Sequence, residues 1–170
     1  MAIYYAVDNG AKVINMSFGK EFSLHKEWVF EAFKYAEKNN VLLVHSAGNN
    51  RFNADENSYY PSDNSFDGSQ EICGNFINVG STSSKLDTTF VSSFSNYGKQ
   101  NVDLFAPGDE IYTTSAANSY ASDSGTSLAG PMVSGTAALI WSHYPKLTAS
   151  QVKQIILESG TAYNLEVLVP

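Results

Sequence analysis

The chain has 170 residues, a formal net charge of -7 and 43% hydrophobic residues. That length accommodates one domain with its own core, and the acidic balance argues against a partner that is nucleic acid. No apolar run in the sequence approaches the roughly 18 residues that a membrane span requires. The single cysteine, Cys73, excludes an internal disulfide framework, and we expect it to be a packing or loop residue.

Helical and strand patterns alternate along the chain. Helices are predicted over residues 2–9, 23–39, 126–143 and 149–159. Short apolar runs typical of buried strands cover residues 12–19, 41–48, 75–81 and 102–108. Residues 109–123 suit irregular or hairpin structure. This order predicts one α/β domain with three layers, in which a parallel β-sheet is flanked by helices on both faces.

Two of the predicted helices carry distinct signals. The helix at 126–143 is apolar nearly all round, which predicts a central and buried position, and Pro131 is expected in its first turn, where proline is tolerated. The last helix opens with Thr148 and Gln151 at the spacing of a capping box, and Gly160 is expected to end it.

The stretch SGTSLAGPMVSG, residues 124–135, places Ser127 at the predicted start of a helix. Unpaired backbone N–H groups and the helix dipole favour negative charge at that point. A nucleophile for acyl transfer needs such a setting, because the attacked carbonyl oxygen becomes an oxyanion. A simple helix cap at Thr126 or Ser127 is the alternative interpretation. The stretch is not the nucleophile elbow G-x-S-x-G, because Ala129 stands where the second glycine should be.

Further motifs accompany this stretch in a fixed order. GAKVINMSFG, VLLVHSAGNN, YYP, FSNYG and VDLFAPG precede GTSLAGPMVSGTAALI, and together they span about residues 2 to 160. In this order they resemble the segments of the subtilisin-like serine proteases, the subtilases. The resemblance implies a subtilisin-like fold and a serine endopeptidase that hydrolyses peptide bonds in a peptide or protein substrate.

The resemblance also implies roles for individual catalytic residues. Ser127 would be the nucleophile that forms an acyl-enzyme. Asn49 would donate its side-chain amide to the oxyanion, beside the backbone N–H of Ser127, and Thr126 would support that site. Taken without the other motifs, Asn49 and Asn50 are equally typical of a simple turn at a strand end.

Two substrate-binding walls are implied in the same way. One wall would pair its backbone with an extended substrate, as a strand added to an edge, and consists of Ser17, Phe18 and Gly19. The other wall of the pocket for the residue before the scissile bond would consist of Ser46, Ala47 and Gly48. Phe18 as a core residue is the alternative interpretation of that aromatic side chain.

The chain departs from the subtilase pattern at several positions. Gly130 and Met132 stand where serine and histidine are usual, outside the chemistry. His45 precedes SAGN where a small residue is expected, and it is either a satisfied strand histidine or a contact to the substrate loop. Residues 51–74 match the family only at YYP, whose tyrosine–proline bond we expect to be cis. That polar stretch leaves the pocket floor and the substrate preference open.

The base that should activate Ser127 is missing from the motifs. A catalytic serine needs a histidine to take its proton and an aspartate to hold that histidine, and His25, His45 and His143 are all placed unsuitably. We therefore expect residues 1–170 to be the C-terminal portion of a subtilase catalytic domain, incomplete and inactive without an N-terminal part. The alternatives are a non-catalytic peptide-binding pseudo-protease and a small-molecule-binding α/β domain.

Cofactors, association and compartment follow from the same resemblance. The chemistry requires no cofactor, although calcium is a common structural ligand in this family, and Asp103 with the loop near Ser62 resembles one of its weak cation sites. The strand at 12–19 would lose the neighbour that the absent part supplies, so self-association through that edge is expected. Because the family is mostly exported, we expect a secreted or cell-envelope protein.

Overall fold

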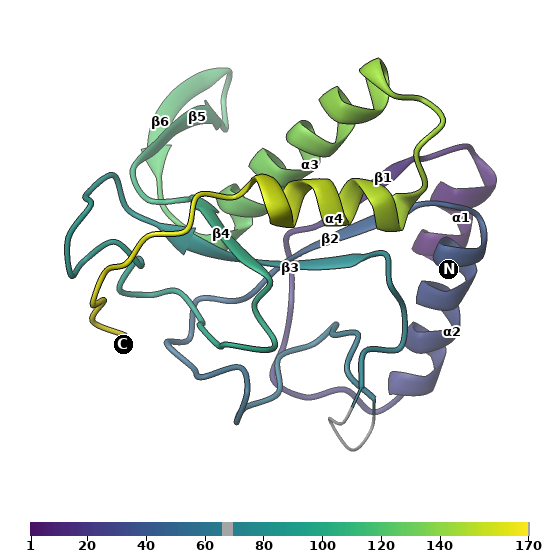
Figure 1. The fold of residues 1–170 in the computed structure, drawn as a ribbon, viewed down its shortest axis with the longest axis horizontal. Coiled ribbons are helices and arrows are strands. Elements are labelled where there is room, and N and C mark those ends of the chain that lie inside the picture. Colours follow the sequence, from purple (N-terminus) through teal and green to yellow (C-terminus); the bar gives the residue numbers. More distant parts are fainter. Residues whose placement is uncertain (66–69, 170) are drawn as a thin grey trace.

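The computed structural model describes residues 1–65 and 70–169 (Figure 1). Its helices are α1 (Ala2–Asp8), α2 (Lys26–Lys38), α3 (Thr126–His143) and α4 (Ala149–Ser159). Its strands are β1 (Val13–Met16), β2 (Leu42–Ser46), β3 (Phe76–Thr82), β4 (Leu104–Pro107), β5 (Ile111–Ser115) and β6 (Ser119–Asp123). Each helix and strand predicted from the sequence is present, with ends shifted by a few residues.

Four strands form one parallel sheet in the order β1-β2-β3-β4. The β1–β2 register runs from Val13 opposite Leu42 to Met16 opposite His45. Helix α2, with α1 beside it, covers one face of the sheet, and α3 and α4 cover the other (Figure 1). The predicted three-layer α/β architecture is therefore confirmed.

Each face of the sheet has its own apolar core. The central strand β2 is buried along its whole length, as expected for a strand with helices on both sides. Its side chains alternate between the faces: Leu42 and Val44 pack in the core that contains Trp141, whereas Leu43 packs in the core that contains Phe33. Cys73 is buried in this second core, as a packing residue.

Local sequence signals set the element ends. Thr148 Oγ1 accepts from the Gln151 N–H at 3.2 Å, and Gln151 Oε1 accepts from the Thr148 N–H at 2.8 Å, so the capping box of α4 is confirmed. Gly10 after α1 has a φ of 83°, the left-handed region that glycine adopts readily. The bond between Tyr60 and Pro61 is cis, as the sequence predicted.

The burial predicted for α3 is wrong on one side of the helix. Ala129 and Val133 are buried toward the sheet, whereas Met132 and Leu139 are 43% and 66% exposed. The helix is apolar nearly all round, but the described part of the chain packs against one side only. An apolar periodicity reports what a face is made of, and it does not report whether another element covers that face.

Two features lie at the margins of the sheet. Within the described ranges β1 has a single strand neighbour, β2, so its outer edge is open. Strands β5 and β6 form a separate antiparallel hairpin just before α3, so of the irregular or hairpin structure predicted for residues 109–123 the hairpin is found. None of the helices in residues 1–65 and 70–169 is both long and apolar enough to cross a membrane.

Candidate active site

The start of α3 is held against the segment that follows β1. Ser17 Oγ donates a hydrogen bond to the backbone oxygen of Ser127 at 2.9 Å. That oxygen has no helical partner, because the residue four positions on is Pro131, which lacks an N–H. Pro131 is the sixth residue of α3, so its predicted place in the first turn is wrong. Ser17 supplies the donor that the proline cannot.

Asn49 reaches the same helix from the end of β2. Its Oδ1 accepts hydrogen bonds from the Thr126 N–H at 3.0 Å and from the Thr126 hydroxyl at 2.8 Å. Because two donors hold the amide oxygen, the assignment of oxygen and nitrogen is fixed and the Nδ2 group points away from them. Asn49 is exposed, and none of the hydrogen bonds among the described residues uses its Nδ2.

Thr126 joins the two segments. Its hydroxyl donates to Asn49 and accepts from the Gly48 N–H at 3.1 Å, and the residue is 1% exposed. Ser127 follows as the second residue of α3 and is half-buried, so its N–H is among those without an acceptor inside the helix. The structure thus brings Asn49, Thr126 and Ser127 together, with unpaired N–H donors beside a serine hydroxyl.

The first predicted substrate wall, Ser17 to Gly19, extends β1 toward this site. Phe18 is 65% exposed, so it does not belong to the core. The Ser17 carbonyl and both backbone groups of Gly19 make no hydrogen bond to the described residues. An extended peptide can pair with such a segment in the way that it adds to a sheet edge.

The second wall, Ser46 to Gly48, is fixed by a residue that the sequence analysis gave no role. Asn96 Nδ2 donates to the Ala47 oxygen at 2.7 Å, and the Asn96 N–H donates to the Gly48 oxygen at 2.8 Å. Ser46 and Ala47 are buried. Asn96 belongs to FSNYG, one of the motifs recognised in the sequence. Its partner Ala47 lies about 50 residues away along the chain, so the motif alone did not predict this contact.

His45 connects the two walls from within β2. Its Nε2 lies 3.0 Å from the Phe18 oxygen and its Nδ1 lies 3.1 Å from Asn78 Oδ1. The ring is 1% exposed, and burial lowers its pKa to about 4, against the smaller effect of the two hydrogen-bonding partners. A neutral imidazole carries one N–H, so it donates to one of these two oxygens only. His45 is thus a buried strand histidine that also lies against Phe18 of the first predicted wall.

None of the three histidines in the described part of the chain contacts Ser127. His25 lies 3.4 Å from Glu27 and stacks on Trp28, and His143 bonds to the last turn of α3. The described residues therefore present the serine and its N–H donors without a base.

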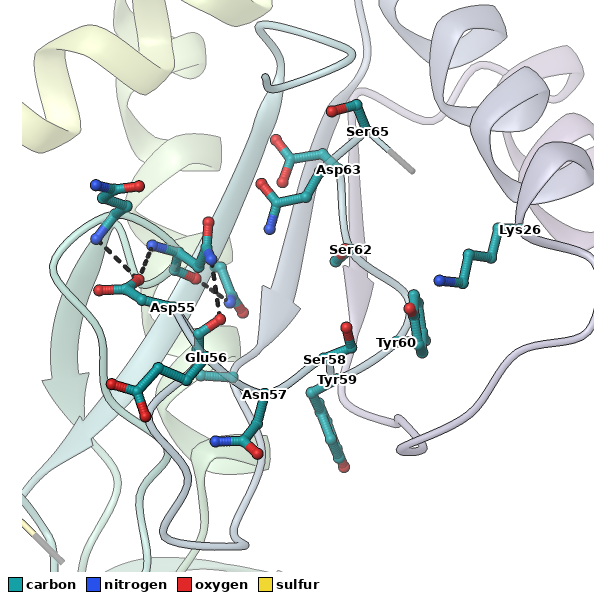
Figure 2. Close-up of a pocket in the computed structure, with 16 residues that line it drawn as sticks. Lys26, Asp55, Glu56, Asn57, Ser58, Tyr59, Tyr60, Ser62, Asp63 and Ser65 are labelled. Atoms are coloured by element: carbon teal, nitrogen blue, oxygen red, sulfur yellow. Dashed lines mark hydrogen bonds between the residues drawn. The ribbon is translucent and has the colours of Figure 1, made fainter. Parts of the chain in front are cut away.

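A polar cavity of about 320 Å³ lies along the loop of residues 54–65 (Figure 2). Asp63 in its lining is 8% exposed, and burial, with the charge of Glu71, raises the pKa of this carboxyl to about 7. Lys153 of α4 reaches Glu71 at 3.3 Å and Asp103 at 3.5 Å. The Lys153 ammonium thus pairs with Glu71 and Asp103, and its charge also acts on Asp63; these three carboxyl groups and Lys153 form one cluster.

This cluster does not fit the cation site suggested by Asp103 and the loop near Ser62. Calcium takes a cage of six to eight oxygen ligands. Here one oxygen of Asp103 accepts from the Asn78 N–H at 2.6 Å and the other faces the Lys153 ammonium. Among the described residues, no group of three or more His, Cys, Asp or Glu side chains is arranged to hold a metal ion.

Comparison with known proteins agrees with the fold. The chain matches the subtilase family over residues 1–167. It is 37% identical over 164 residues to subtilisin DY of Bacillus licheniformis, which covers 96% of this chain and 54% of that protein. It is 38% identical over 144 residues to the major intracellular serine protease of Bacillus subtilis (strain 168), covering 83% and 40%. A solved structure of a cold adapted subtilisin-like serine proteinase has a TM-score of 0.76 at 29% identity, covering 98% of this chain and 59% of that chain.

A parallel sheet with helices on both faces defines the class of α/β proteins, and here a serine lies in the first turn of a helix that packs on the sheet. Within that class, the chain belongs to the subtilase family. It spans about half the length of the curated relatives it matches.

Proposed function

We propose that this chain carries the nucleophile, the oxyanion donors and the substrate walls of a subtilisin-type serine endopeptidase. The observation that supports this most is the hydrogen bonding of Asn49 Oδ1 to Thr126. It turns the amide N–H group of Asn49 out toward solvent beside the first turn of α3, which contains Ser127. An acyl-transfer site requires donors aimed at the developing oxyanion in this way.

In the proposed reaction Ser127 Oγ attacks the carbonyl carbon of a peptide bond. A base takes the serine proton as the carbon–oxygen bond forms, and the carbonyl oxygen becomes an oxyanion held by the Asn49 amide and the Ser127 N–H. The base then gives the proton to the leaving amine, and water releases the acyl group from Ser127. No cofactor takes part.

We propose that the base and its aspartate come from an upstream part of the protein, so that residues 1–170 alone are inactive. Two observations support this: no histidine in the described residues contacts Ser127, and the match covers only 54% of subtilisin DY. The open edge of β1 and the exposed side of α3 are the surfaces on which that part would pack. Without it, these surfaces promote self-association of the chain.

A peptide-binding pseudo-protease is the second candidate. It is favoured by one observation, namely that Asn96 holds the second proposed wall although the described residues place no histidine against Ser127. The two candidates differ in the reactivity of the serine and not in peptide binding.

Fluorophosphonate labelling separates them. We expect Ser127 to be labelled when the upstream part is joined to the chain, and the chain alone and a Ser127→Ala variant to stay unlabelled. Absence of labelling in the joined protein, with peptide binding retained, would establish the pseudo-protease instead. Labelling of the chain alone would show that it holds its own base.

The compartment and structural calcium stay predictions. Export to the cell envelope or beyond is supported only by the usual location of the family's members, and one relative is named an intracellular protease. The Lys153 ammonium beside Asp103 disfavours calcium at that carboxylate.

A further inference from the structure

The ring of Tyr59 lies between the two substrate walls. Gly19 on one wall and Gly48 on the other carry no Cβ, and the Tyr59 ring occupies the space that a side chain would need at either position. A Cβ placed on Gly48 would lie 2.8 Å from Tyr59 Cε1 and 2.9 Å from Cζ, and a Cβ on Gly19 would overlap the same two ring atoms. One edge of the Tyr59 ring therefore contacts both walls.

The backbone around Tyr59 is tied to the walls as well. The next residue, Tyr60, pairs with Lys20 through two backbone hydrogen bonds of 2.8 Å, directly after Gly19. Farther along, Asn50 Nδ2 donates to Glu21 Oε1 at 2.8 Å and links the ends of the two walls. These bonds fix the chain on either side of the ring, so the ring position follows from the fold.

The Tyr59 side chain is half-buried. Its centroid lies 6.1 Å from that of the buried His45 ring. Burial, with the charge of Glu21, raises the pKa of the Tyr59 hydroxyl. Figure 2 shows the Tyr59 ring pointing away from the side of the polar cavity where Asp63 and Ser65 lie. Tyr59 is one of the residues that line this cavity, and its ring also lies against Gly19 and Gly48 of the two walls.

We propose that Tyr59 is the floor of the pocket for the residue before the scissile bond, and that it restricts this residue to glycine, alanine or serine. This inference rests on the proposed peptidase function. A peptide paired with Gly19 in extended conformation sends alternate side chains to opposite sides, and the one entering between the walls meets the tyrosine ring. A large side chain has no room there unless the ring moves.

Cleavage of a matched peptide series tests the proposal in the chain joined to its upstream part. The peptides carry alanine, phenylalanine or lysine before the scissile bond and are otherwise identical. We expect kcat/KM for alanine to exceed that for phenylalanine by at least about 10-fold, the scale on which a pocket discriminates by size. Tyr59→Ala should reverse this preference, whereas Tyr59→Phe should keep it.

Tyr120→Ala, at an exposed tyrosine of the β5–β6 hairpin, is the matched control and should leave the preference unchanged. Equal cleavage of the alanine and phenylalanine peptides by the unaltered protein would overturn the inference. So would a preference for lysine, which would assign the pocket to Glu21, or a Tyr59→Ala variant with an unchanged ratio.

A failure of the proposed function is seen separately, as loss of both fluorophosphonate labelling and cleavage of every peptide. In that case, calorimetric titration with product peptides that end in alanine or phenylalanine still tests the pocket, because it needs no turnover. We expect the alanine peptide to bind the unaltered protein more tightly, and Tyr59→Ala to gain affinity for the phenylalanine peptide by at least about 10-fold. Equal affinities, or no binding of either peptide, would overturn the inference.

Discussion

The Thr126 hydroxyl orients the side-chain amide of Asn49. It donates to Asn49 Oδ1 at 2.8 Å and accepts from the Gly48 N–H at 3.1 Å. In the proposed site Thr126 is therefore a positioning residue, because it acts through Asn49 and through the second proposed substrate wall.

Replacing this hydroxyl tests the positioning role. Thr126→Val keeps the shape but leaves the buried Gly48 N–H and one lone pair of Asn49 unpaired, so we expect kcat to fall at least about tenfold with a small change in KM. Thr126→Ser keeps the hydroxyl and should restore kcat. Steady-state kinetics of the protein joined to its upstream part measures both, and equal kcat values for the two variants would contradict the role.

His45 makes the stability of the chain depend on pH. Its pKa is lowered from 6.5 to about 4 by burial, so between these values the unfolded chain binds a proton that the folded chain does not. The contribution of His45 to the free energy of unfolding should therefore fall as the pH drops from about 6.5 to about 4, by up to roughly 3 kcal/mol. Asp63 acts in the opposite sense, because its raised pKa adds stability at low pH that is lost as the pH rises toward about 7.

Comparison with His45→Gln isolates the histidine, since Asp63 contributes equally to both proteins. Urea unfolding should find the variant less stable at pH 7, because a buried hydrogen bond to Phe18 or Asn78 is altered. The difference should shrink at pH 4.5, where only the unaltered chain is penalised. A stability difference that does not change with pH would contradict the assigned pKa.

At the scale of elements, a hydrogen bond joins α3 to the segment that follows β1. Pro131 leaves the Ser127 carbonyl without its helical donor, and Ser17 Oγ donates to that oxygen at 2.9 Å. This bond holds Ser127, the proposed nucleophile, next to the proposed first substrate wall.

A double-mutant cycle tests that link. Ser17→Ala should lower the free energy of unfolding by about 1–3 kcal/mol, because a partly buried carbonyl loses its donor. In a Pro131→Ala background the new backbone N–H can satisfy the same oxygen, so Ser17→Ala should cost less. Equal costs in the two backgrounds, measured by urea unfolding, would show that the Ser17 bond and the proline are unrelated.

The elements could largely be predicted from the sequence, whereas several contacts could not. Glycine-bounded apolar runs locate β2 and β3, because a strand buried on both faces must be apolar throughout. Periodicity could not show that one side of α3 is exposed, because coverage depends on other segments. The motif YYP was recognisable from the resemblance, but the contact of the Tyr59 ring with Gly19 and Gly48 was not, since three separate segments meet there.

The candidate site follows the same division. Ser127, Asn49 and Thr126 were recognisable from motifs whose order matches a family. Asn96 and Lys153 were not, because their partners Ala47 and Asp103 lie about 50 residues away along the chain. Contacts of this kind follow from the packing of the sheet, and no local sequence pattern predicts them.

At the scale of the whole molecule, the described chain leaves two apolar surfaces uncovered. The outer edge of β1 has no strand partner among the described residues, and Met132 and Leu139 are exposed on α3. Open sheet edges and apolar patches both favour association.

We therefore predict that the chain alone self-associates as its concentration rises. Sedimentation velocity should show growing oligomers, and Met132→Lys with Leu139→Lys should reduce them, because two charges cannot be buried cheaply in the contact. Leu86→Lys, at another exposed leucine, is the matched control and should change little. A monomer at every concentration would contradict the prediction.

The proposed peptidase function requires Asn49 and Ser127 to act on the same oxyanion, and the kcat of Asn49→Ala tests this directly. In the protein joined to its upstream part, kcat should fall about 10²–10³-fold with KM nearly unchanged, a magnitude known from the equivalent donor of subtilisin rather than derived from this structure. Asn57→Ala, at an exposed asparagine in the loop, is the control and should keep full activity. A kcat for Asn49→Ala equal to that of the unaltered protein would contradict the proposed site.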